Sequence, residues 1–111
     1  GTFNIREIFV TTMTINTSYS VTAFAWGYVS GTSITRSNVS WSVTNPSTGN
    51  YTVTHNLGSS TYGVQLTALR ASGSGAYIAK IASVSTNSFA VIVFDDGGVA
   101  RDGDFFFLVT D

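Results

Sequence analysis

The stretch YSVTAFAWGYVS, residues 19–30, decides the fold class of this chain. Small or aliphatic residues alternate in it with larger ones, so that an extended strand would carry one set on each face: Val21, Ala23, Ala25 and Gly27 against Thr22, Phe24, Trp26 and Tyr28. A period of two is the spacing of a β-strand, and the helical spacing of three and four is missing here. We therefore predict a strand over residues 19–30.

Similar short segments flank this strand on both sides. They are rich in β-branched and aromatic residues and are bounded by Gly, Asn, Asp, Ser or Pro, which favour turns. We predict strands over residues 7–15, 19–30, 34–36, 39–44, 51–55, 62–71, 76–85, 88–94 and 104–110. No window of ten or more residues has the apolar spacing of a helix, which excludes βαβ units and a parallel sheet.

Three turn segments indicate antiparallel hairpins: residues 45–50, which hold the only proline, residues 72–75 and the two-residue link 86–87. We predict an all-β fold, an antiparallel β-sandwich of about eight strands, jelly-roll-like, as a single domain over residues 1–111. We expect its core to contain Val21 or Val53, Val64, Leu66, Ile78, Val91, Val93, Phe106 and Leu108.

The composition limits the partners. Charged residues make up 10% of the chain, the net charge is −1 and cysteine is absent. A nucleic-acid-binding domain would carry a basic patch, so we expect no nucleic-acid partner. We also expect no membrane insertion, because the longest apolar runs, such as Phe105 to Val109, have only the length of a strand.

Sparse charge together with apolar runs favours self-association. Hydroxyl and amide groups are cheaper to desolvate than charged ones. Residues 105–107 and 89–94 are apolar on both faces of their strands, which implies a cover on each side of the sheet. We expect a homotrimer, and the alternative is a monomer with a sheet coated by Ser and Thr.

The middle of the chain carries a family resemblance. A Trp-containing strand and a Gly hairpin (residues 25–32) are followed by Asn38-Val39-Ser40 and then by a Gly-x-Tyr-x-Val strand (residues 49–53). This order resembles the C-terminal tip, the receptor-binding or head domain, of phage and prophage tail fibres and tailspikes. The second half is similar to the same family in a Tyr-led strand at Tyr62, a hairpin at residues 85–89 and an Asp-Gly loop before the last strand.

The resemblance implies a non-enzymatic distal domain of a trimeric fibre. Such a domain mediates attachment to a host-surface receptor, assembly of the trimer, or both, and we expect the receptor to be a glycan. The domain would be part of the virion and would be extracellular during attachment. We expect this chain, which begins at Gly1, to be a fragment of a longer fibre protein. The alternatives are a stand-alone carbohydrate-binding module and a purely structural virion domain.

No motif indicates catalysis, a metal site or a cofactor. His55 is the only histidine, and neither a nucleophile motif nor a second ligand accompanies it. The loop 95–104 contains four carboxylates within ten residues, yet it lacks the spacing of a calcium loop and contains Arg101. We interpret it as a turn segment, with cation binding as the alternative.

Aromatic side chains are the remaining candidates for a binding site. They offer flat surfaces to sugar rings, and alternation along strands turns some of them away from the core. We take as candidate ligand-binding residues Trp26, Tyr28, Trp41, Tyr62 and Tyr77. The competing interpretation is that these rings, like Tyr51, pack in the core and between subunits.

Overall fold

The computed structural model describes residues 12–15, 19–69 and 75–111, and all the regular structure in these residues is β-strand. The strands are β1 (Thr12–Ile15), β2 (Tyr19–Ser30), β3 (Ser33–Ser37), β4 (Ser42–Ser47), β5 (Asn50–Thr54), β6 (Gly63–Leu69), β7 (Tyr77–Val84), β8 (Ser88–Asp95) and β9 (Asp104–Thr110). The strands predicted over residues 19–30 and 104–110 have the observed bounds. The strand predicted over 7–15 falls within the described residues only from residue 12.

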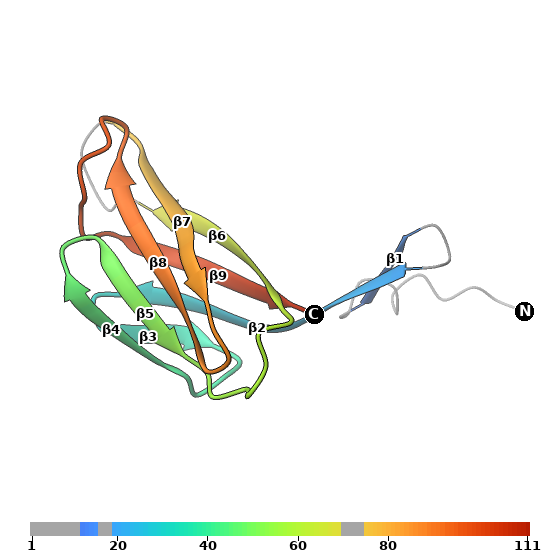
Figure 1. The fold of residues 1–111 in the computed structure, drawn as a ribbon. Helices are drawn as coiled ribbons and strands as arrows, with labels where there is room; N and C mark the ends of the chain where they lie inside the picture. Colours follow the sequence, from blue (N-terminus) through green and yellow to red (C-terminus); the bar gives the residue numbers. More distant parts are fainter. Residues whose placement is uncertain (1–11, 16–18, 70–74) are drawn as a thin grey trace, which may run out of the picture.

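Two antiparallel sheets face each other in a sandwich (Figure 1). The first has the order β3-β2-β9-β6 and the second the order β4-β5-β8-β7. The first and last strands of the sandwich, β2 and β9, are neighbours in the first sheet. The predicted all-β fold, an antiparallel sandwich of about eight strands, is confirmed.

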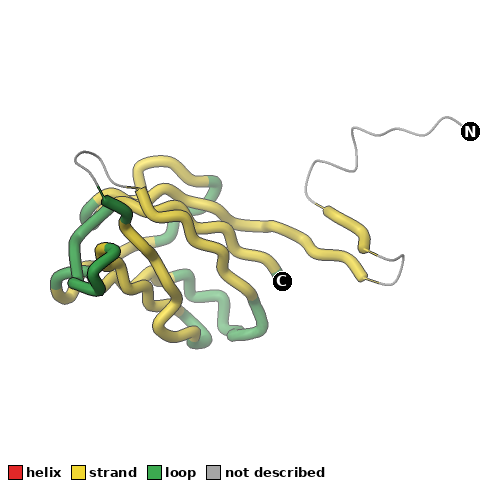
Figure 2. The backbone as a smooth tube through the Cα atoms, turned by 90° about the horizontal axis from the view of Figure 1, so that it is seen from above, coloured by secondary structure: helices red, strands yellow, loops and turns green. Residues whose placement is uncertain are grey.

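Strand β2 forms part of the sandwich and also part of a two-stranded ribbon with β1. Its first residues, Tyr19 to Thr22, pair with β1, whereas residues from Ala23 onward pair with β9 and, from Gly27, with β3. The two-stranded ribbon made with β1 therefore projects from one end of the sandwich, as both views show (Figures 1 and 2). The last residues of β9 lie where this ribbon leaves the sandwich, because Thr110 pairs with Ala23.

The core lies between the two sheets and is built from alternate residues of the central strands β2, β5, β8 and β9, with Val43 of the edge strand β4. Fully or nearly fully buried are Ala25, Val29, Val43, Tyr51, Val53, Phe89, Val91, Val93, Phe105, Phe107 and Val109. Phe107 is at its centre: the Trp41 ring stacks on it at 5.8 Å between centroids, and Phe89 meets it edge-on at 5.6 Å. The predicted burial of Val53, Val91 and Val93 is confirmed, whereas Val21 lies outside the described side chains.

The expected burial of Phe106, Leu108 and Ile78 is wrong. Residues 105–109 are all apolar, so no polar residues mark the outer face of this strand. The sequence pattern therefore could not show whether the odd- or the even-numbered residues face inward. The odd-numbered set is inside. Ile78 is 43% exposed because Tyr77, Ala79 and Ile81 are the inward residues of β7. Val64 and Leu66 are only partly buried, since β6 is an edge strand of its sheet.

The hairpin predicted over residues 45–50 is tighter than expected. Strand β4 extends to Ser47, and the turn is confined to Thr48 and Gly49, where Gly49 has a φ of +76°. Pro46 lies within the strand, at a register shift between Thr44 and Ser47. Because β4 is an edge strand, the missing N–H of proline costs no ladder bond there.

Candidate functional site

Two of the five candidate aromatic residues lie on the outer face of the first sheet. Trp26 is 39% exposed and stacks on Phe106 of β9, with 6.2 Å between the ring centroids. Tyr28 donates its hydroxyl to Asp104 Oδ2 at 2.9 Å, and the Arg36 guanidinium lies 4.9 Å from its ring centroid. The hydrogen bond to the Asp104 carboxylate raises the pKa of Tyr28. The phenol is thus neutral and its ring is fixed on the sheet.

The other three candidates face the core. The Trp41 ring stacks on Phe107 and lies 5.4 Å from the His55 ring. Tyr62 meets His55 edge-on at 4.9 Å, and Tyr77 packs against the core beside Gly103. The five residues therefore do not form one flat platform, and only Trp26 and Tyr28 are brought together on an outer face.

His55 is buried at the end of the core, and its surroundings define its tautomer. Its Nδ1 accepts the backbone N–H of Leu57 at 3.0 Å, so the neutral ring carries its proton on Nε2, which donates to the Tyr62 hydroxyl at 2.7 Å. The Tyr62 hydroxyl in turn lies 3.0 Å from the carbonyl oxygens of Ser85 and Ser88. Burial lowers the pKa of His55. Both ring nitrogens are engaged within the protein, an arrangement typical of a structural histidine.

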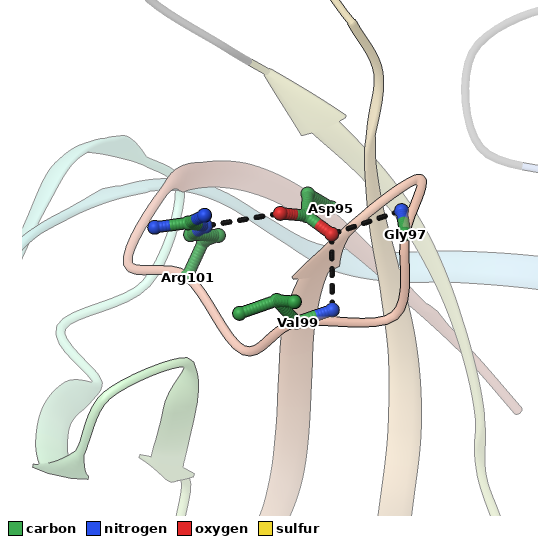
Figure 3. A network of polar contacts seen from close by, with 4 residues as sticks. All are labelled: Asp95, Gly97, Val99 and Arg101. Carbon is green, nitrogen blue, oxygen red and sulfur yellow. Dashed lines mark hydrogen bonds and ion pairs between the residues drawn. The ribbon is translucent and has the colours of Figure 1, made fainter.

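The acidic loop after β8 is held together by its own carboxylate (Figure 3). Asp95 Oδ1 accepts the backbone N–H groups of Gly97 and Val99, each at 2.9 Å, while its Oδ2 pairs with Arg101 Nε at 3.0 Å. These backbone bonds, followed by the ion pair with Arg101, lower the pKa of Asp95. The segment is an Asp-centred turn, in agreement with the interpretation of this part of the sequence.

The neighbouring carboxylates have structural partners too. Asp102 Oδ1 accepts the backbone N–H of Gly49 at 2.7 Å and the Asn45 amide at 3.2 Å, which ties the loop to the β4–β5 turn. Asp104 accepts the Tyr28 hydroxyl. Within the residues that the structure describes, no group of three or more Asp, Glu or His side chains is arranged to hold a metal ion.

An open cleft of about 360 Å³ lies at the end of the sandwich where the β1–β2 ribbon begins. It is lined by Phe24, Leu57, Ser59, Thr61, Tyr62 and Asp111. Of these, only Tyr62 was a candidate from the sequence. Phe24 lies at a register shift between Ala23 and Ala25 in the pairing with β9. A β-bulge of this kind redirects a side chain, and no periodic sequence pattern predicts it.

No protein-family model, curated protein or solved structure matches this chain.

The geometry offers two surfaces for non-covalent binding. The outer face of β2 and β9 presents aromatic and aliphatic side chains, and the cleft combines rings, hydroxyls and a carboxylate. In the described part of the chain, every buried side-chain polar atom already has a hydrogen-bond partner. Burial of either surface against a partner is therefore the chemistry that this arrangement supports best.

Proposed function

We propose that this chain is a non-enzymatic attachment and assembly module, the tip domain of a homotrimeric phage tail fibre or tailspike. On this proposal the domain is part of the virion, is extracellular during attachment and binds a host-surface receptor, which we expect to be a glycan. The sequence resemblance over residues 25–53 supports the family, and the outer face described above supports the assembly.

The observation that carries the proposal is a contiguous apolar surface on the outside of the first sheet, which we call the β2–β9 outer face. It consists of Trp26, Tyr28, Phe106 and Leu108. Trp26 is opposite Leu108 and Tyr28 is opposite Phe106 in the strand register, so the four side chains form one block. On β6 the block continues with the uncharged Gln65 and Thr67, which are opposite Leu108 and Phe106.

Among the described residues, charged groups contact this face at one margin. Arg36 lies over the Tyr28 ring and Asp104 accepts the Tyr28 hydroxyl, so both charged groups contact the same residue. Aromatic side chains with few charges are what the cores of subunit interfaces contain. A neighbouring subunit would bury Trp26 and Phe106 without leaving an isolated charge in the contact.

Sedimentation equilibrium of the 111-residue chain at tens of micromolar tests the assembly. We expect the mass of a trimer, and we expect Trp26→Lys to shift the mass toward the monomer, since a buried tryptophan typically contributes about 2 kcal/mol or more to an interface. Val99→Lys is the matched control, because Val99 is an exposed apolar residue in the loop outside this face. A monomer mass for the unmodified chain would contradict the proposal.

A stand-alone carbohydrate-binding module is the second candidate, favoured by the open cleft. A glycan array distinguishes the two: a monomer that binds a sugar favours the carbohydrate module, whereas a trimer that binds none favours a purely structural virion domain. Hydrolysis of a polysaccharide that is lost in Asp102→Asn or Asp104→Asn would contradict the non-enzymatic assignment.

A further inference from the structure

The loop between β5 and β6 presents a partly exposed apolar side chain between two left-handed residues. Leu57 is 43% exposed and lies between two residues with left-handed backbone, Asn56 with a φ of +56° and Gly58 with a φ of +72°. Glycine and asparagine are residues that adopt the left-handed conformation readily, so the chain can turn sharply here at little cost. The turn leaves the Leu57 side chain partly exposed.

Hydrogen bonds to the β7–β8 hairpin hold the conformation of the β5–β6 loop. The N–H groups of His55 and Asn56 donate to the Asn87 carbonyl at 2.8 and 3.0 Å, and that of Gly58 donates to Asn87 Oδ1 at 3.2 Å. Ser59 N–H donates to the Thr86 carbonyl at 3.0 Å, and Leu57 N–H to His55 Nδ1. Every backbone N–H from residue 55 to residue 59 is therefore bonded, and Leu57 is presented by a rigid support.

Leu57 forms one part of the cleft lining, and aromatic rings form another. The Tyr62 hydroxyl is fixed by His55 and by the carbonyl oxygens of Ser85 and Ser88, so its ring has a single orientation. Phe24 contributes the second ring from the bulge in β2. The apolar part of the lining is thus preformed, which reduces the entropy lost when a ligand binds.

The polar part of the lining has unused hydrogen-bonding capacity. Ser59 Oγ accepts the N–H of Thr61 at 3.2 Å and shares one bond of 2.8 Å with the Thr61 hydroxyl. Two hydroxyls offer two donors and four acceptor positions, so these bonds leave one donor and two acceptor positions for a ligand. Asp111 adds a carboxylate to the lining, and no Lys, Arg or His is among the described residues that line it.

We propose that this cleft binds a neutral saccharide unit, and this inference rests on the proposed attachment function. A pyranose ring has an apolar C–H face, which suits Phe24, Tyr62 and Leu57, and a rim of hydroxyls, which suits Ser59, Thr61 and Asp111. The volume of about 360 Å³ lies in the range of about 300–1,000 Å³ that is usual for small-molecule sites. The Asp111 carboxylate in the lining would repel the carboxylate of an acidic sugar, which favours a neutral one.

Amide chemical-shift mapping on the ¹⁵N-labelled chain tests this inference. The probes are methyl glucoside, methyl galactoside, N-acetylglucosamine and lactose, each titrated to tens of millimolar. We expect shifts at the amides of Leu57, Ser59 and Thr61 with at least one probe. Leu57→Ser should raise the dissociation constant about tenfold, since a buried leucine contributes about 1.5 kcal/mol or more.

The control is Leu69→Ser, a leucine of matching exposure (40%) on β6 that is not part of the cleft lining. It should leave the dissociation constant unchanged. Asp111→Asn should weaken binding about fivefold, the difference between a charged and a neutral hydrogen bond. Binding of protonated glucosamine without binding of N-acetylglucosamine would overturn the inference, because the carboxylate would then be attracting a cation alone.

The outcomes separate this inference from the proposed assembly. A trimer whose cleft amides do not shift with any probe overturns the saccharide site and leaves the assembly standing. Shifts around Trp26 and Tyr28 instead of the cleft overturn the saccharide site and also contradict the burial of this face between subunits. A monomer whose cleft amides shift, with the predicted loss in Leu57→Ser, supports the saccharide site and overturns the trimer.

Discussion

Gly27 shows how a single residue determines the packing of the sandwich. It is an inward-facing position of β2, and the Phe107 ring occupies the space where a side chain would be. A Cβ at Gly27 would lie 2.5 Å from two carbon atoms of that ring and 3.0 Å from Ile34 Cγ2. The packing of Trp41 and Phe89 on the Phe107 ring therefore depends on the absence of a methyl group at residue 27.

We predict that Gly27→Ala lowers the free energy of unfolding by about 1–3 kcal/mol, the usual cost of overpacking a core. Urea denaturation measures this change. Gly63→Ala is the control: a Cβ there would meet only Thr110 Oγ1, at 3.3 Å, and we expect a change within about 0.5 kcal/mol. Equal stability of the two variants would show that Phe107 does not pack as described.

At the scale of single elements, the loop after β8 is organised by the Asp95 side chain rather than by apolar contacts. We predict that Asp95→Ala increases the hydrogen-exchange rates of the Gly97 and Val99 amides several-fold, because both lose their acceptor. Asp96→Ala, a change at an exposed neighbour, should leave both rates unchanged. Unaltered exchange in Asp95→Ala would mean that the backbone alone holds the turn.

The same scale shows what the sequence could and could not determine. The bounds of β2 and β9 were predicted to the residue, β2 from its alternation and β9 from its run of aromatic and β-branched residues, because turn-forming residues flank both strands. The buried face of β9 could not be predicted, because Phe105 to Val109 are all apolar and only the register against Gly27 selects the buried set. The cleft was also missed, because it depends on a bulge at Phe24 and on left-handed Asn56, neither of which has a periodic signal.

At the scale of the whole molecule, stability depends on the protonation of one buried imidazole. Protonation of His55 would place a hydrogen on Nδ1, against the N–H of Leu57. The pKa of His55 in the folded chain is below its usual value of 6.5, so the unfolded chain binds the proton more readily. Its contribution is therefore complete above pH 6.5, decreases as the pH falls below that value and levels off below the folded pKa.

We predict that the urea midpoint decreases between pH 7.5 and pH 5 and that His55→Gln removes most of this decrease. Glutamine can donate to Tyr62 and accept from Leu57 without titrating in this window. Asp95 has a lowered pKa and affects stability only at pH values near and below 3.8, so the two effects are separable. An equal decrease in both proteins would assign the pH dependence to another group.

The continuity of β2 has a mechanical consequence. A pull along the β1–β2 ribbon enters the sandwich at Ala23, beside Thr110 and next to the bulge that carries Phe24. A ligand seated against Phe24, Tyr62 and Asp111 would take up that tension within the same end of the sandwich. Tension between a bound ligand and the ribbon would then be carried at this end of the sandwich, where Tyr62 connects the cleft to Phe89 of the core.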